Sequence, residues 1–416
     1  MRYHMKVLSS RTSGEWLSPQ PAPTADSSVT LQRDDPAVAE IKRALSEVLR
    51  CSNLVVLSGL GTSLCVAPAA PGANKAPTMA DLWMLLSTRH NARSSAEAPA
   101  GASFLDMLTL VGHPPGVIDI EALLSRCRLA EAFLDGRPKD QVVRFIELAE
   151  AIIIEATNFV VINHELPVHT EFLRRIARRS QRKSRAKIFT TNYDRCFEEA
   201  GRQGRYVVVD GFSHTVPPTF DAIHFTYETA RHVGDTETLE PIPNLFHLYK
   251  LHGSVDWQRH AGSGEITKWT QSGKPVLIYP RNSKYELAFE QPYLEMISAF
   301  QAALRRPDTG LVVVGFGFND NHLAEPIMSA IRSNLSLKAV FASPGLAPWE
   351  EGERRGLGEC VSNKHLGKLR DLASAGDARI GLLNLRFEEL VPLMPDLAAD
   401  TDLELHMERL RRVDLA

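Results

Sequence analysis

The sequence predicts an α/β protein built on a Rossmann-like parallel sheet with a helical insertion. Short continuous apolar runs, such as Asn53–Leu57 and Leu311–Val314, are typical of strands buried on both faces. Segments with apolar residues at three- and four-residue intervals alternate with these runs, as helices do in a parallel sheet. Two such segments, 119–134 and 140–163, both precede the central strand and indicate the insertion.

The elements before the central strand follow from the same patterns. A helix is expected over 37–50, and the strand over 53–57 follows it. The Ala- and Pro-rich residues 65–77 predict a loop, and Thr78 or Asp81 can cap a helix that ends near Arg89. Residues 91–117 look like a second long loop. Residues 1–30 are expected to be a flexible arm, with an interaction strand as the less favoured alternative.

A third helix is predicted over 171–185, and it carries basic residues in two rows of i,i+4 spacing. The rows contain Arg174, Arg178, Arg182 and Arg175, Arg179, Lys183. A solvated face is the favoured interpretation of this basic stripe. A partner surface or an acidic patch within an oligomer is the second, and nucleic-acid contact through Arg174–Lys187 is the least favoured.

The central strand is expected at 186–189, and short apolar runs after it predict the rest of the sheet. The further strands are expected at 207–209, 245–251, 276–279, 311–314, 338–342 and 380–385. Helices are expected at 293–304, 364–372 and 402–413. The predicted organisation is an arm at 1–30, a Rossmann-like domain at 31–118 and 186–345, the helical insertion at 119–185 and a C-terminal extension at 346–416.

Length, charge and cysteines limit the class of protein. A chain of 416 residues exceeds what one core usually supports, so two compact units, or one unit with a large insertion, are expected. The longest apolar runs, such as Leu311–Phe316, are too short to cross a bilayer. Residues 1–28 lack the apolar core of a signal peptide, so a cytoplasmic protein is expected. A formal charge of −3 argues against a chain held to nucleic acid by its overall field. The five cysteines are scattered, odd in number and form no CxxC pair, so neither a disulfide framework nor a zinc ribbon is expected.

Four predicted strands end in breaks that contain glycine or polar residues. Gly59 and Gly61 could let the backbone approach a pyrophosphate, with the amides and hydroxyls of Thr62 and Ser63 beside them. A tight turn explains this segment about as well, because a third glycine of the dinucleotide fingerprint is missing. The last break holds Gly315, Gly317 and Asp320, whose backbone could close over a phosphate or ribose or could simply end the strand, with Asp320 as helix cap.

The other two breaks contain the candidate catalytic residues. Asn192 can position a water or a ribose hydroxyl, and Asp194 can accept from an amide such as a carboxamide, with Thr191 beside them. The alternative is that Asn192 caps a helix and Asp194 faces solvent. His252 stands before Gly253, and histidine is the usual general base near neutral pH. A structural histidine is the alternative there.

Two other patterns fail on spacing. In the segment that begins with His164-Glu165, the next histidine is His169, so three residues instead of two separate it from the glutamate. Pro167 also interrupts the helix that a zinc-protease motif requires. The chain also lacks GxxxxGK[ST], so we expect no ATP hydrolysis by this chain alone.

In their order and spacing, the four breaks resemble the sirtuin-like superfamily, most closely its bacterial branch of NAD-consuming defence proteins. The resemblance runs from about Asn53 to His322 and rests on Gly-Leu-Gly-Thr-Ser at 59–63, Thr-Thr-Asn-Tyr-Asp at 190–194, His252-Gly253 and Gly-Phe-Gly at 315–317. By this resemblance, Asn192 orients the water or ribose at the scissile N-glycosidic bond of NAD and His252 acts as base. No metal is implied.

Departures from the deacylases of this superfamily shift the expected reaction. The Pro-Asp-Phe-Arg-type loop is absent after the first glycine turn, where Leu64–Pro68 stand, and the four zinc cysteines are missing. The resemblance therefore implies hydrolysis of NAD to nicotinamide and ADP-ribose in anti-phage defence. A non-catalytic NAD- or ADP-ribose-binding scaffold and an NAD-dependent deacylase are the alternatives. The whole-chain pattern resembles bacterial cytoplasmic members that form homo-oligomers and pair with a HerA-like hexameric ATPase.

Overall fold

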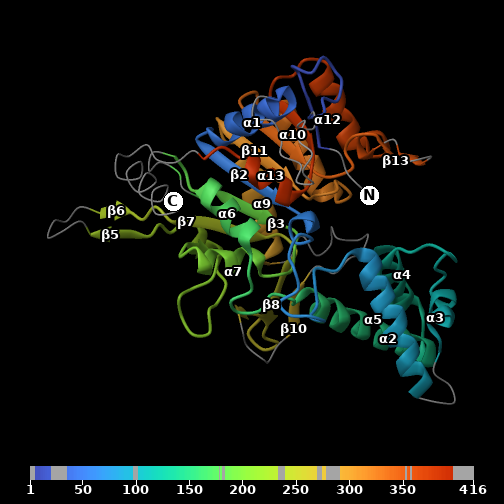
Figure 1. Cartoon of the computed structure of the whole chain (residues 1–416). Coiled ribbons are helices and arrows are strands. Elements are labelled where there is room, and N and C mark those ends of the chain that lie inside the picture. Colours follow the sequence, from blue (N-terminus) through green and yellow to red (C-terminus); the bar gives the residue numbers. More distant parts are fainter. Residues whose placement is uncertain are drawn as a thin grey trace.

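A computed structural model shows the architecture of the chain (Figure 1). It describes residues 5–19, 35–96, 102–177, 179, 183–232, 239–268, 274–277, 291–351, 354–356 and 358–396. The predicted α/β class with a largely parallel sheet is confirmed. Within these ranges, no helix combines the length and apolar character needed to cross a bilayer.

The central sheet has eight strands, of which the seven after the first run parallel. From one edge to the other they are β1 (Lys6–Ser9), β15 (Ile380–Asn384), β12 (Lys338–Ala342), β11 (Thr309–Val314), β2 (Asn53–Ser58), β3 (Lys187–Thr190), β7 (Leu245–Lys250) and β4 (Val207–Val209). Strand β1 pairs antiparallel with β15.

Helices cover both faces of this sheet, and the alternation along each strand decides which core a side chain enters. Val55 and Leu57 of β2 lie in one core, whereas Leu54 and Val56 lie in the other. The first core includes α9 (Tyr293–Leu304), α10 (Asn321–Ser333) and α12 (Lys364–Ser374). The second includes α1 (Pro36–Leu49), α6 (Pro167–Ala177), α7 (Cys196–Gln203) and α13 (Phe387–Leu393). The result is a three-layer α/β/α body.

A separate helical module, residues 79–157, stands beside this body (Figure 1). It consists of α2 (Met79–Ala96), α3 (Phe104–Leu110), α4 (Ile120–Phe133) and α5 (Gly136–Thr157). These helices bury their own core, with Leu86, Phe145 and Ile153 at its centre. The expected insertion at 119–185 therefore begins too late, and the loop expected over 91–117 contains α3. Helix α6 packs in the second core of the body instead of joining the module.

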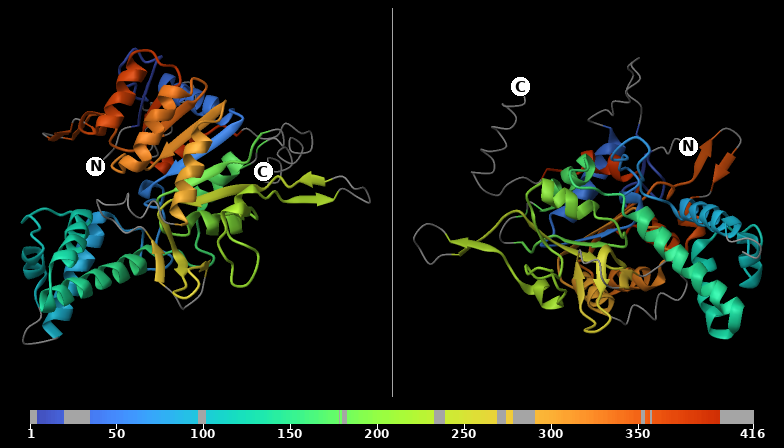
Figure 2. Two further views of the ribbon diagram at one scale, coloured as in Figure 1. Left: turned by 180° about the vertical axis from the view of Figure 1, so that it is seen from behind. Right: turned by 90° about the horizontal axis from the view of Figure 1, so that it is seen from below.

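Smaller elements are added around the body. Strand β8 (Gly253–Arg259) pairs with β9 (Ile266–Lys268) and β10 (Lys274–Leu277). The hairpin β5 (Ala230–His232) and β6 (Leu239–Pro241) projects away from the side that carries the helical module (Figure 2). The remaining short elements are η1 (Leu60–Thr62), η2 (Ala222–Thr226), β13 (Trp349–Glu351), β14 (Arg354–Gly356) and α11 (Glu359–Ser362).

The two chain ends differ from expectation. Within the arm expected at 1–30, the described residues 5–19 contain β1, whose Val7 and Leu8 are fully buried on opposite faces of the sheet. The edge strand β1 is stabilised because its two faces pack into the two cores on opposite sides of the sheet. The C-terminal extension contributes β15, α12 and α13 to the body, so 346–396 is part of the main fold. The helix expected at 402–413 lies outside the described residues.

The basic stripe is used within the chain wherever it is described. Arg174 and Arg175 both pair with Glu171, and Arg174 also reaches Asp396. Arg179 donates to the carbonyls of Leu49, the last residue of α1, and of Cys51 and Ser52 after it. Lys183 donates to the carbonyl of Arg50, and burial lowers the pKa of Lys187. Arg178 and Arg182 lie outside the described residues. The described members brace the fold, and contact of this segment with nucleic acid stays a prediction.

Candidate functional site

The four breaks begin at one level of the sheet. Ser58 of β2 lies opposite Val314 of β11 and Thr190 of β3, and Thr190 lies opposite Lys250 of β7. Strands β2 and β11 are neighbours, but the chain continues from β2 toward β3 and from β11 toward β12, on opposite sides. This is the topological switch point at which open parallel sheets bind ligands.

The two glycine turns at the switch point pack against each other. A Cβ on Gly59 would lie 2.5 Å from the carbonyl oxygen of Gly315, and one on Gly61 would lie 2.6 Å from the Cα of Gly315. Gly315 itself has a φ of +62°, a conformation that favours glycine. The close approach that requires these glycines is thus backbone against backbone, not backbone against a phosphate.

The groups expected to hold a phosphate are used inside the turn. The amides of Gly59, Gly61, Thr62 and Ser63 all donate to carbonyls of β11 or of the turns themselves. The hydroxyl of Thr62 bonds to Ser58 and to the carbonyl of Gly59. In this arrangement those four amides cannot also cradle a phosphate, so the tight-turn interpretation describes the segment better.

Asn192 is buried and is held by the first glycine turn. Its Nδ2 lies 3.0 Å from the carbonyl oxygen of Gly59, 3.2 Å from Thr62 Oγ1 and 2.8 Å from Ser63 Oγ. The carbonyl of Gly59 can only accept, so the nitrogen of the carboxamide faces the turn. Oδ1 is then the atom through which Asn192 would contact a water or ribose hydroxyl.

Asp194 also has a structural partner on each oxygen. Oδ2 accepts from Ser63 Oγ at 2.6 Å, and Oδ1 accepts from the amide of Cys196 at 3.0 Å, at the start of α7. Asp194 is 7% exposed, so the alternative in which it faces solvent is wrong. Ser63 thereby links Asn192 to Asp194 and ties the 190–194 segment to the turn after β2.

His252 faces a second histidine that the sequence analysis did not single out. The Nε2 atoms of His252 and His322 are 3.2 Å apart, and both rings are buried. His322 belongs to the first turn of α10. Gly253 follows with a φ of +83°, and a Cβ there would overlap the carbonyl of Val276. Glycine is therefore required for β8 to leave His252 in this position.

Five of the predicted site residues line one cavity of about 100 Å³ between the sheet edge and the helical module. They are Thr191, Asn192, Asp194, His252 and Asp320. Its opposite wall contains residues that the sequence analysis missed, namely Met79, Leu82, Glu121 and Thr157 of the helical module and Phe159 after it.

The remaining predicted residues do not line this cavity. They are Gly59, Gly61, Thr62, Ser63, Gly253, Gly315 and Gly317. They shape the turns that hold the lining residues, and a Cβ on Gly317 would meet only the Asn319 side chain, at an ordinary contact distance of 3.5 Å. Asp320 stands at the N-cap position of α10 without a side-chain cap bond and belongs to the cavity lining.

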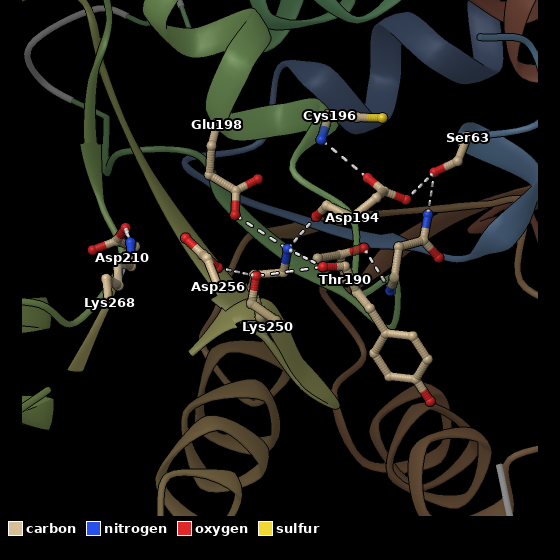
Figure 3. A network of polar contacts seen from close by, with 12 residues as sticks. Ser63, Thr190, Asp194, Cys196, Glu198, Asp210, Lys250, Asp256 and Lys268 are labelled. Atoms are coloured by element: carbon tan, nitrogen blue, oxygen red, sulfur yellow. Dashed lines mark hydrogen bonds and ion pairs between the residues drawn. The ribbon is translucent and has the colours of Figure 1, made fainter. Parts of the chain in front are cut away.

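A buried lysine supports the 190–194 segment (Figure 3). Lys250, at the end of β7, is 1% exposed, and its Nζ donates to the carbonyls of Tyr193 and Asp194 and lies 3.1 Å from Glu198 Oε1. Ser254 Oγ adds a bond to the Tyr193 carbonyl and one to Asp256. The sequence analysis did not predict this support. The signal for it was a lysine inside a continuous apolar strand, because a buried ammonium requires internal partners.

Electrostatics exclude a nucleophilic thiol here. Burial, with Asp194 close by, raises the pKa of Cys196 well above its usual range, so the thiol stays neutral. Burial also raises the pKa of the Glu198 carboxyl, which the nearby Lys250 opposes. In the described part of the chain, no three His, Cys, Asp or Glu side chains are placed to hold a metal ion.

Comparison with known proteins fits this geometry. The chain has no match among curated proteins. The family model of the SIR2-like domain matches residues 186–353, which include Asn192, His252 and the glycine turn at 315–317 but not the turn at 59–63. An NAD-related function suits a domain of this kind. This region of the chain is therefore similar to the SIR2-like domain, and the match supports a sirtuin-like assignment.

Proposed function

We propose that the chain is an NAD⁺ glycohydrolase that releases nicotinamide and ADP-ribose. The observation that carries the proposal is that Asn192 and His252, from the ends of neighbouring strands, line one cavity together with Asp320. This places an amide, an imidazole and a carboxylate at the switch point of the sheet. All three belong to the region of the chain that is similar to the SIR2-like domain.

Each side chain has a role in that reaction. Breaking the N-glycosidic bond develops positive charge on the ribose, which the Asp320 carboxylate would stabilise across the cavity. Asn192 would orient the attacking water or a ribose hydroxyl through Oδ1, and His252 would take the proton. The contact of His252 with His322 gives the proton a second nitrogen on which to reside.

The size of the cavity limits what it can hold. Pockets for drug-sized ligands occupy roughly 300–1,000 Å³, whereas this cavity measures about 100 Å³. It suits one end of the dinucleotide, and we place the nicotinamide ribose there. Met79 and Leu82 form part of the wall, so binding of the remainder requires the helical module to shift outward at α2.

The proposal is tested by incubating the purified chain with NAD⁺ and measuring nicotinamide by chromatography. Asn192→Ala and His252→Ala should each reduce the rate at least a hundredfold, within the range for loss of a catalytic base or an orienting group. Gly317→Ala is the matched control, because a Cβ there would meet only the Asn319 side chain at an ordinary contact distance and the position does not line the cavity. Full activity in both site variants would refute the assignment of the site.

One observation favours a second function, binding of NAD or ADP-ribose without turnover. The carboxamide nitrogen of Asn192 and both oxygens of Asp194 already bond within the protein, as they would in a site that only shapes a pocket. Calorimetry with ADP-ribose, alongside the nicotinamide assay, separates the two functions. Saturable ADP-ribose binding without nicotinamide release would establish the second.

We also propose that this activity depletes NAD⁺ in anti-phage defence, in the bacterial cytoplasm, within a homo-oligomer joined to a HerA-like hexameric ATPase. The support is the resemblance of the four breaks and the SIR2-like match. Co-expression with an ATPase encoded beside the gene, followed by size-exclusion chromatography and the NAD⁺ assay, tests this part. Separate elution of the two proteins and NAD⁺ levels independent of the ATPase would contradict it.

A further inference from the structure

A second, larger cavity lies within the helical module. It is a groove of about 670 Å³ between α2, α3 and α5, within the size range of pockets that hold small organic ligands. The groove is lined by the second half of α2 and by residues 137–151 of α5, whereas the strand-end cavity is lined by the start of α2 and the last residue of α5, and the two share no lining residue. Their nearest lining residues on α5, Ala151 and Thr157, are about 9 Å apart along the helix, so the two cavities are distinct.

Arginines from two helices meet at this groove. Arg93 of α2 and Arg137 and Arg144 of α5 line it, and none of them forms an ion pair or hydrogen bond within the described part of the chain. Other arginines of the module are paired: Arg89 with Glu155, and Arg128 with Glu131 and Glu150. Unpaired guanidinium groups that converge on a cavity are suited to bind phosphate through two parallel hydrogen bonds.

The rest of the lining suits a base and a sugar. His90, Leu148 and Ala151 give the groove a partly exposed apolar wall, and the ring of His90 packs edge-on to the buried Phe145 with centroids 5.0 Å apart. Aromatic and apolar side chains of this kind hold the flat face of a base. Asp140 and Glu147 also line the groove, and carboxylates beside a phosphate site can accept from ribose hydroxyls. They would repel a simple polyanion that has no such hydroxyls.

We propose that this groove binds a nucleotide, with its phosphates on Arg93, Arg137 and Arg144 and its base against the wall made by His90 and Leu148. Arg137 lies in the first turn of α5, a helix of 22 residues whose N-terminal dipole also favours a phosphate. The site is independent of NAD⁺ cleavage at the strand ends. It gives the helical module a ligand of its own on the helices that wall the proposed active site.

The test uses ATP as probe on the purified full-length chain, with binding measured by isothermal titration calorimetry at low salt. One saturable site per chain is expected. Arg93→Gln combined with Arg144→Gln should weaken ATP binding at least tenfold, because two guanidinium groups that would form charge-assisted bonds to phosphate are removed. Lys139→Gln, on α5 but outside the groove lining, is the matched control and should bind as the wild type does. Asn192→Ala should also bind normally, which separates this site from the strand ends.

Three outcomes would overturn the proposal. The first is no saturable binding at millimolar ATP. The second is equal ATP affinity in the double arginine variant and the wild type. The third is tripolyphosphate binding as tightly as ATP, which would show a site for phosphate alone without recognition of the nucleoside. Circular dichroism of the double variant confirms that the module is folded, because both arginines lie outside its buried core.

Discussion

Lys250→Met tests the support beneath the proposed site. The substitution keeps the length and volume of a side chain that is 1% exposed, but it removes the charge that pairs with Glu198 and bonds to the carbonyls of Tyr193 and Asp194. Removing one partner of a buried ion pair costs roughly 3–5 kcal/mol. The Glu198 side chain keeps 21% exposure, so the lower end applies and we expect a loss of about 3 kcal/mol.

The assay is urea unfolding followed by circular dichroism. With an m-value of about 3 kcal/mol/M, the midpoint should fall by about 1 M. Adding Glu198→Gln to Lys250→Met should recover part of the loss, because no uncompensated carboxylate then remains, while the two carbonyls still lack their donor. Lys364→Met is the matched control, since its side chain is 65% exposed with Nζ 3.9 Å from Glu325 Oε1, and it should cost less than about 0.5 kcal/mol.

The pH dependence of the Lys250→Met loss provides a second readout. Burial already raises the pKa of Glu198 in the wild type, and removing Lys250 takes away the charge that opposes this shift. A carboxyl whose folded pKa lies above its unfolded value destabilises the fold increasingly as the pH rises through that range. The loss should therefore be smaller at pH 5 than at pH 8. A midpoint within error of the wild type, or no recovery in the double variant, would refute the reasoning.

Packing supports two further predictions. Gly61→Ala should lower the free energy of unfolding by about 1–3 kcal/mol and abolish NAD⁺ turnover, because its Cβ would meet Gly315 Cα at 2.6 Å, whereas Gly317→Ala should do neither; equal urea midpoints for the two variants would contradict this. Burial lowers the pKa of His169 and of His247 to about 4, so both stay neutral in the fold at pH values where the unfolded chain binds protons. Stability should fall by about 1.4 kcal/mol per pH unit for each histidine as the pH drops from 6.5 toward 4, and His169→Phe should reduce that slope; an unchanged slope would count against a buried neutral imidazole.

The strand ends were predictable from the sequence because each apolar run stops at a recognisable residue. The continuous apolar runs at 53–57 and 311–314 stop at glycine or polar residues, and parallel pairing brings those stops to one level. The position of Asn192 and His252 on one cavity follows from that register. Local pattern was sufficient here because a buried parallel strand is apolar throughout.

What the sequence could not show depends on contacts between distant segments. Gly59 and Gly61 are compatible with a phosphate or with another backbone, and the decisive neighbour, Gly315, lies more than 250 residues away. Strand β1 has four residues and pairs with β15 across most of the chain. Helix α3, within the residues expected to form a loop, has seven residues, too few for a clear period.

Nicotinamide release is the measurement that tests the central claim most directly. The purified chain, alone and with an ATPase encoded beside it, is incubated with NAD⁺, and nicotinamide and ADP-ribose are quantified by chromatography. We predict equimolar nicotinamide and ADP-ribose from the wild type in at least one of these conditions and almost none from Asn192→Ala or His252→Ala. NAD⁺ that persists in both conditions, or two site variants that cleave it as fast as the wild type, would contradict the account.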